Sequence, residues 1–297
     1  MTRDTDTAGR PPAAAPTGSP TRRRYRRQDQ AGVGTYVALT ITALLFLFPL
    51  YYSIVAASHT PSDLYDGQPP LFPGPGLFDN LARALDQAEL FEALGRSLVV
   101  SGTVTASTVF FCTIAGFAFA KLRFTGRTAL FGIALATLTI PPTLGIVPLY
   151  VVMSRLGLVN NLASVILPAA VTAFGVFFMR QYISQALPDE LIEAATVDGA
   201  GLNRILFSIV LPIARPGMAV LGILSFMASW NDFLWPFIAV RNSPTIQVAV
   251  AGIGAGYTPD IAVILAGTVI ATVPLIVVTA IFGRQIVGGI TAGAVKS

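Results

Sequence analysis

The sequence reads Glu193-Ala194-Ala195-Thr196-Val197-Asp198-Gly199 and, after a spacer of nine residues, Ile209-Val210-Leu211-Pro212. This stretch lies in a polar loop between two long apolar segments. It predicts more about the architecture than any other part of the chain, because its pattern combines a short helix with a fixed spacing to the apolar segment that follows.

The residues around this stretch predict where that helix begins and ends. Asp189 and Glu190 follow Pro188, and acids in the first turn after a proline are typical of a helix N-terminus. Leu187, Leu191 and Ala194 or Ala195 recur at helical spacing and give one apolar face. Gly199 and Gly201 are expected to end the helix, with Gly199 at a positive φ. Small alanines on the exposed side would let the backbone of a partner approach closely.

Composition identifies an integral membrane protein. Of its 297 residues, 54% are hydrophobic and 11% are charged, and the mean hydropathy is +0.69. Soluble domains usually carry about twice that charged fraction. Apolar blocks of about 20 residues are long enough to cross a bilayer, where backbone polar groups must be satisfied within helices. The sequence therefore predicts an all-α membrane protein.

Six blocks are expected to form transmembrane helices: 33–57, 97–120, 128–152, 162–179, 217–240 and 261–283. The apolar stretch 245–256 is too short to span. Residues 1–32 are rich in Ala, Pro, Thr and Arg and predict a disordered cytoplasmic tail. Its arginine run could be mistaken for a secretory signal, but the block that follows is longer than an ordinary signal core, which favours an uncleaved first helix.

Basic residues set the expected orientation. With the N-terminus in the cytoplasm, 15 of the 19 Lys and Arg residues fall in cytoplasmic segments and 4 fall outside. Positive charges concentrate on the cytoplasmic side of membrane proteins. Both termini and the loop at about 180–213 are therefore expected in the cytoplasm, and the acidic loop 58–95 outside.

Two features inside the membrane blocks suggest a solute path. Prolines 141, 142 and 148 interrupt the third block, which predicts either a helix that lines a cavity or a simple kink. Four polar or aromatic residues interrupt the block 217–240: Ser229, Trp230, Asn231 and Asp232. They could contact a sugar through hydroxyl, amide, carboxylate and indole groups. Alternatively, Asn231 and Asp232 cap broken backbone near Pro236 or contact a partner.

The sequence offers little support for an enzyme or a metal protein. It contains no phosphate-binding loop, zinc motif or nucleophile elbow. Cys112 is the single cysteine and His59 the single histidine, so neither an intrachain disulfide nor a metal cluster is expected. No cofactor is expected to bind this chain.

The loop pattern Glu-Ala-Ala, three residues, Gly, nine residues, Ile-x-Leu-Pro resembles the EAA loop of the permeases of ATP-binding-cassette (ABC) importers. Other stretches are similar to the carbohydrate branch of that family, of the maltose-transporter second-permease type. They are 140–142, 146–150, 156–161, 178–181, 230–236 and 289–296. The resemblance covers about 33–297.

The resemblance implies a six-helix domain at 33–297 with the type I ABC importer permease (MetI-like) fold in the cytoplasmic membrane of a bacterium. It also implies a second, different permease, an ATPase dimer that binds ATP and magnesium, and an extracellular solute-binding protein that delivers a sugar. The residues expected to couple to the ATPase are Glu193, Ala194, Ala195, Asp198, Gly199 and Pro212. The alternatives are an ABC permease for another solute and an ion-coupled carrier.

Overall fold

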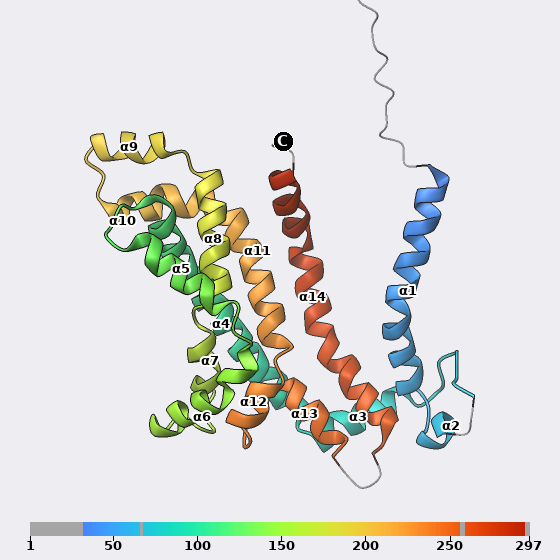
Figure 1. Cartoon of the computed structure of the whole chain (residues 1–297). Helices are drawn as coiled ribbons and strands as arrows, with labels where there is room; N and C mark the ends of the chain where they lie inside the picture. Colours follow the sequence, from blue (N-terminus) through green and yellow to red (C-terminus); the bar gives the residue numbers. More distant parts are fainter. Residues whose placement is uncertain (1–31, 66–67, 256–258, 295–297) are drawn as a thin grey trace, which may run out of the picture. The chain divides into compact units, whose positions relative to one another are not determined.

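The computed structural model describes residues 32–65, 68–255 and 259–294, with side chains as far as Gly283. The tail expected at 1–32 lies outside the described residues, except for Gly32. Every regular element within the described ranges is a helix, as predicted. The chain divides into two units, 1–48 and 49–297, and the second contains all the sites analysed below (Figure 1).

The predicted blocks all correspond to helical stretches that are long and apolar enough to cross a membrane. Five such stretches occur among the described residues, and a bent pair makes a sixth. They are α1 (Val33–Ala57); α4 (Leu90–Lys121); α7 (Ala163–Ala169) with α8 (Ala173–Ala186); α10 (Leu202–Ile205) with the π-helical turn η2 (Leu206–Val210) and α11 (Leu211–Trp230); α14 (Ile261–Ala294); and α5 (Arg127–Thr137) with η1 (Pro142–Gly145) and α6 (Ile146–Arg155).

Short helices occupy the connections between these spans. They are α2 (Pro61–Tyr65), α3 (Leu77–Gln87), α9 (Asp189–Val197), α12 (Leu234–Ala239) and α13 (Ile246–Ile253). Within the second unit, α9 and α10 lie at one end, and α3, α12 and α13 lie at the opposite end (Figure 1). The eight residues of α13 confirm that 245–256 does not span.

The block predicted at 217–240 was placed too late in the chain. The helix begins at Leu202, passes through η2 and contains Pro212 and Pro216, and it ends at Trp230. A π-helical turn changes the hydrogen-bonding partners of the backbone, and η2 directly precedes the prolines. At the other end, the Asn231 side chain donates to the Met227 carbonyl at 2.9 Å and terminates the helix.

The third block is broken rather than gently kinked. The helix α5 and the η1–α6 stretch, which begins at Pro142, meet at 95° across a break that contains Pro141. Proline lacks a backbone N–H, and its ring obstructs the preceding turn. The structure favours the first of the two expectations over a simple kink, because the helix is broken and Pro142 lines a cavity described below.

Glycines let three helices approach closely in the half of the unit that carries α9. A Cβ atom added at Gly116 of α4 would lie 2.7 Å from the Met179 Cβ of α8, and one at Gly175 of α8 would lie 2.7 Å from the Cys112 Sγ. A Cβ at Gly217 of α11 would lie 2.6 Å from the Tyr182 ring. Small residues at interfaces provide such backbone contact between membrane helices. The helices α4, α8 and α11 therefore form one closely packed group.

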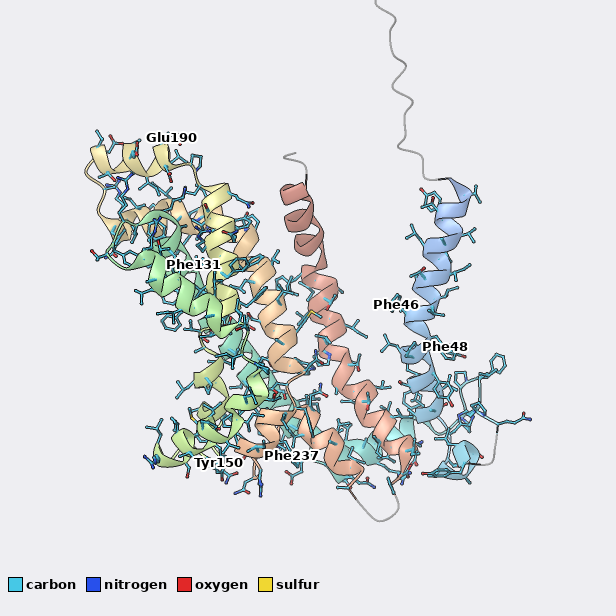
Figure 2. All side chains as sticks on the ribbon, viewed as in Figure 1. Phe46, Phe48, Phe131, Tyr150, Glu190 and Phe237 are labelled. Carbon is cyan, nitrogen blue, oxygen red and sulfur yellow. The ribbon has the colours of Figure 1, made fainter. Side chains whose placement is uncertain are left out.

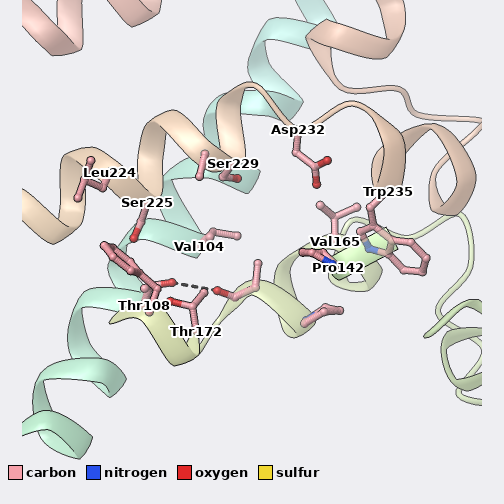
Figure 3. A pocket seen from close by; sticks show the side chains of 14 residues that line it. Val104, Thr108, Pro142, Val165, Thr172, Leu224, Ser225, Ser229, Asp232 and Trp235 are labelled. Atoms are coloured by element: carbon pink, nitrogen blue, oxygen red, sulfur yellow. Dashed lines mark hydrogen bonds between the residues drawn. The ribbon is translucent and has the colours of Figure 1, made fainter. Parts of the chain in front are cut away.

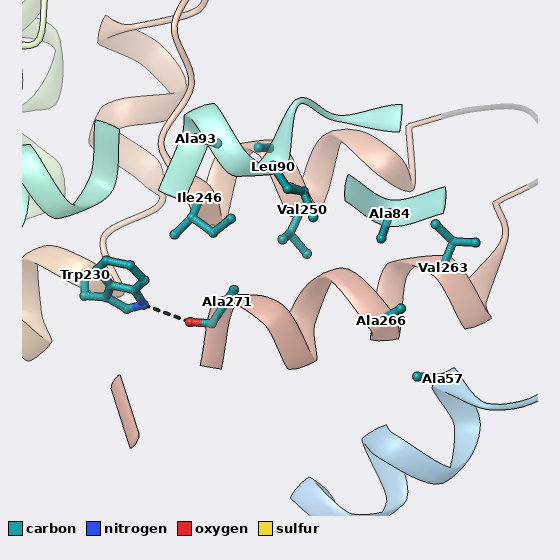
Figure 4. Packing of buried hydrophobic residues seen from close by; sticks show 11 residues of the cluster. Ala57, Ala84, Leu90, Ala93, Trp230, Ile246, Val250, Val263, Ala266 and Ala271 are labelled. Carbon is teal, nitrogen blue, oxygen red and sulfur yellow. Dashed lines mark hydrogen bonds between the residues drawn. The ribbon is translucent and has the colours of Figure 1, made fainter. Parts of the chain in front are cut away.

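A second core lies at the opposite end of the unit. Figure 4 shows Trp230 of α11 packed with residues of α3, α4, α13 and α14. The Trp230 Nε1 donates to the Ala271 carbonyl of α14 at 3.1 Å. Nearby, Asn80 of α3 donates to the carbonyls of Ala57 and His59, both at 2.9 Å, which satisfies the end of α1. Polar side chains here bind backbone groups that the helix ends leave free.

The second tryptophan satisfies a carbonyl that a proline leaves without its helical partner. Pro168 lies inside α7, so the carbonyl of Ser164, four residues earlier, receives no intrahelical N–H. The Trp235 Nε1 donates to this Ser164 oxygen at 2.9 Å in a buried position. Trp235 thus joins α12 to α7 by replacing a missing backbone bond.

We predict that Trp235→Phe destabilises the protein by about 1–2 kcal/mol, because it leaves the Ser164 carbonyl buried without a donor. Pro168→Ala restores a backbone N–H at that position, so it should cost less in the Trp235→Phe background than in the wild type. Thermal unfolding of the four proteins in detergent measures this coupling. Strictly additive effects of the two substitutions would contradict the explanation.

Candidate functional site

The helix α9 begins and ends where the sequence predicted. Pro188 occupies the N-cap position, and Asp189 and Glu190 lie in the first turn. The helix ends at Val197. Glu190 is exposed and lies on the outer side of α9 (Figure 2). Negative charges favour this end of a helix because the first N–H groups point outward there.

A Schellman motif terminates α9. The Ala200 N–H donates to the Ala195 carbonyl at 2.9 Å, and the Gly199 N–H donates to the Thr196 carbonyl at 3.0 Å. Gly199 has a φ of +76°, which confirms the predicted positive φ. This pair of bonds is the usual way in which a left-handed residue ends a helix. Gly201, by contrast, has a φ of −70°.

The two faces of α9 differ from the predicted pattern in one respect. Ile192 and Ala195 pack against the buried cluster formed by α4, α8, α10, η2 and α11. Glu193 and Ala194 are exposed, as expected for a docking face. Leu191, predicted on the apolar face, is instead 45% exposed. Leu191 and Ile192 are adjacent apolar residues, and either could belong to the buried face of a helix. Spacing alone therefore could not identify which of the two faces inward.

An ion pair fixes the start of α9 to the end of α4. The Lys121 Nζ lies 2.5 Å from the Asp189 Oδ1, and the Lys121 side chain is only 6% exposed. The Lys121 ammonium holds the pKa of Asp189 below its ordinary value. The carboxylate therefore stays ionised at neutral pH, and the pair is lost only in acid, as the pH falls through the lowered pKa.

The rest of the expected coupling loop belongs to the adjoining helices. Residues 180–186 complete α8, and 202–213 include α10, η2 and the start of α11. Exposed Asp198 is the C-cap residue of α9, whereas Pro212 lies in the first turn of α11. Pro212 is also exposed, but it belongs to a different helix from Glu193 and Ala194.

A cavity of about 650 Å³ lies among α4, α7, α8 and α11, and Pro142 from the third block is one of its lining residues. Its walls come from α4, η1, α7, α8, α11 and α12, as Figure 3 shows. The apolar lining includes Val104, Val165 and Leu224, and the polar lining consists of Thr108, Thr172, Ser225, Ser229 and Asp232, with the indole of Trp235 beside them. A mainly apolar hollow with a few polar groups is typical of a solute site.

The structure separates the four residues proposed for the solute path. Ser229 and Asp232 line the cavity, whereas Trp230 and Asn231 do not. Trp230 is 1% exposed and packs in the core of Figure 4. The Asn231 amide caps the end of α11, which agrees with the alternative interpretation for that residue.

Several cavity residues lay outside the sequence prediction. Thr108 donates to the Ala169 carbonyl at 2.9 Å, and Thr172 accepts from the Gly175 N–H at the start of α8. Ser225 precedes Ser229 by one helical turn. This repeat of serines on α11 is the sequence feature that could have identified Ser225 as a cavity residue. Trp235 followed the predicted patch by three residues.

No group of three or more His, Cys, Asp or Glu side chains that could hold a metal ion occurs in the described part of the chain. The described polar groups of the cavity are hydroxyls and one carboxylate. Such groups bind a solute through hydrogen bonds.

The sequence matches the family described as "Binding-protein-dependent transport system inner membrane component" over residues 112–291, a range that includes both α9 and most of the cavity. It is 32% identical to the lactose transport system permease protein of Rhizobium radiobacter, covering 88% of this chain and 95% of the relative. It is 34% identical to an arabinooligosaccharides transport system permease protein of Halalkalibacterium halodurans, again covering 88% and 95%.

Two further comparisons agree with these. The chain is 31% identical to an sn-glycerol-3-phosphate transport system permease protein of Yersinia pestis, covering 86% of this chain and 94% of the relative. A solved bacterial ABC transporter involved in the import of the acidic polysaccharide alginate contains a chain of the same fold. The TM-score is 0.74 at 23% identity, covering 85% of this chain and 95% of that one.

We predict that Gly199→Val abolishes or strongly reduces ATP-coupled transport while the chain still inserts into the membrane. A β-branched residue is strained at a φ of +76°, at a cost of about 1–2 kcal/mol or more, so the Schellman end of α9 is lost.

Gly201→Val is the matched control, since this glycine has a negative φ and no atom within 4 Å of an added Cβ. Membrane insertion and transport are measured for both variants. Equal transport by the Gly199→Val and Gly201→Val proteins would contradict a role for the geometry at Gly199.

Proposed function

Because the chain belongs to the family of inner membrane components of binding-protein-dependent transport systems, we propose that it is the permease subunit of an ABC importer that carries a sugar across the membrane. The chain itself is a multi-pass transport subunit. The named relatives favour this function over that of an ion-coupled carrier.

One observation carries the mechanism: α9 is an exposed, firmly anchored helix between two spans. Lys121 fixes its start, the Schellman motif fixes its end, and Ile192 and Ala195 hold its inner face against the packed spans. Its outer face offers Glu193 and Ala194 to a partner. Movement of a subunit that holds α9 would therefore be passed to α4, α8 and α11.

The partner that holds α9 is an ATPase subunit, in our proposal. ATP and magnesium bind there, and hydrolysis takes place there. A second permease completes the membrane part of the importer, and an extracellular solute-binding protein delivers the sugar. The family description, which specifies binding-protein-dependent transport, supports this set of partners.

The cavity bounded by α4, α7, α11 and the break at Pro142 forms part of the solute path. Ser229 and Asp232 are its proposed solute contacts from the end of α11. A broken helix in a membrane is tolerated where it lines such a space, because its free backbone groups then have access to water or solute.

In this proposal the protein lies in the cytoplasmic membrane, with α9 and both termini on the cytoplasmic side. The distribution of basic residues supports this orientation. In the second unit, the C-terminal end of α14 lies at the same end as α9 (Figure 1), which agrees with a cytoplasmic C-terminus.

We expect uptake of radiolabelled lactose or arabinooligosaccharide to require this chain, its second permease, its ATPase and its binding protein together. Proteoliposomes with the complete complex test this, and an ATPase subunit without its phosphate-loop lysine is the control. The purified chain alone should neither bind nor hydrolyse ATP. Uptake by this chain without the ATPase would instead indicate a carrier, and saturable nucleotide binding would reveal an unrecognised site.

The orientation has its own test in a Cys112→Ala background. A Thr196→Cys substitution on α9 should react with an impermeant maleimide only after the membrane has been opened. An Asp86→Cys substitution on α3 should react in intact cells, because α3 lies at the opposite end of the unit. Labelling at position 196 in intact cells would reverse the orientation.

A further inference from the structure

The chemical class of the solute is left open by the relatives. Two of them are named for the neutral sugars lactose and arabinooligosaccharides, and one for sn-glycerol 3-phosphate, which carries an anionic phosphate. All three are about equally similar to this chain. The charge of the cavity distinguishes between these classes, provided that the proposed function holds.

Asp232 is the single ionisable residue among the described residues that line the cavity. Figure 3 shows its side chain pointing into the space between the end of α11, α7 and η1. No lysine, arginine or histidine in the described ranges lines this space. A phosphate or carboxylate on a solute would therefore meet a negative charge and find no compensating cation among the described residues that line the cavity.

The apolar walls strengthen that effect. Val104, Val165 and Leu224 lie around the same space and reduce the screening that water would provide. Coulomb energies rise as the effective dielectric constant falls, so like charges repel more strongly here than in solution.

The remaining polar groups suit an uncharged polyol. The hydroxyls of Ser225 and Ser229 have no hydrogen-bond partner among the described residues, so they can donate to or accept from a solute. The Asp232 carboxylate can accept from solute hydroxyl groups. The Trp235 ring adds an apolar surface at the edge of this polar strip.

We infer that the Asp232 side of the cavity selects neutral saccharides and excludes phosphorylated or acidic sugars. The inference rests on the proposed function, and it adds a role for a single residue. Asp232 also lies close to the backbone N–H of Trp235 in α12. The substitution Asp232→Asn keeps an oxygen for that contact and removes only the charge.

The charge is tested directly by the modification rates of a cysteine in the cavity. The complete complex carries Cys112→Ala and Ser229→Cys, and it is treated with methanethiosulfonate reagents of similar size that are anionic, neutral or cationic. Adding Asp232→Asn should raise the modification rate by the anionic reagent about tenfold and lower the rate by the cationic one. The rate with the neutral reagent should not change. The matched control is Asp86→Asn, an exposed carboxylate on α3, which should change none of the three rates.

Equal effects of Asp232→Asn on all three reagents would overturn the inference, since they would indicate a change of access and not of charge. An unchanged ratio of the anionic to the cationic rate would overturn it as well. Both results would leave the proposed function intact.

A second measurement addresses the solute itself. A deletion strain and its complemented parent are grown on lactose, arabinotriose, glycerol 3-phosphate and galacturonate as sole carbon sources. Loss of growth confined to neutral saccharides is expected. Loss of growth on glycerol 3-phosphate or galacturonate, with growth on the neutral saccharides retained, would overturn the inference. It would still support the proposed function as an importer. Uptake that persists without the ATPase, measured in the proteoliposomes described above, would instead count against the proposed function.

Discussion

The structure depends on one constraint: inside a membrane, every backbone N–H and C=O must find a partner within the protein or in an aqueous space. Prolines in the spans violate this locally, and particular side chains restore it. Trp235 donates to the carbonyl left free by Pro168, and Thr108 donates to the carbonyl of Ala169 at the end of α7. Side chains from the neighbouring helices α4 and α12 therefore satisfy carbonyls that α7 leaves free.

The same constraint explains why the cavity lies where it does. The break at Pro141 and Pro142, the interruption between α7 and α8 and the end of α11 all border one space of about 650 Å³. Three helices thus lose their regular hydrogen bonding at about the same place. The cavity forms where these helix ends meet, and the hydroxyls of Thr172 and Ser229 are among the groups that line it.

The sequence predicted the spans and α9 because those features follow from local chemistry. Pro188, the two acids after it and Gly199 determine the ends of α9, and long uncharged blocks identify the membrane helices. The start of this span was missed, because the predicted block began at 217, whereas the helical stretch begins at Leu202 and continues through η2 past Pro212 and Pro216. Trp230 was assigned to the solute path because its burial against α14 depends on a contact between residues 41 positions apart in the chain.

Two features of α4 together have a mechanical consequence. Lys121 at one end binds α9, and Thr108, about 20 Å away along the same helix at about 1.5 Å per residue, forms part of the cavity wall. Between them, Cys112 and Gly116 lie directly against α8, which leaves little compliance in that stretch. In the proposed mechanism, α4 would therefore carry a displacement of α9 directly to the wall of the cavity, and a more flexible α4 would weaken that coupling.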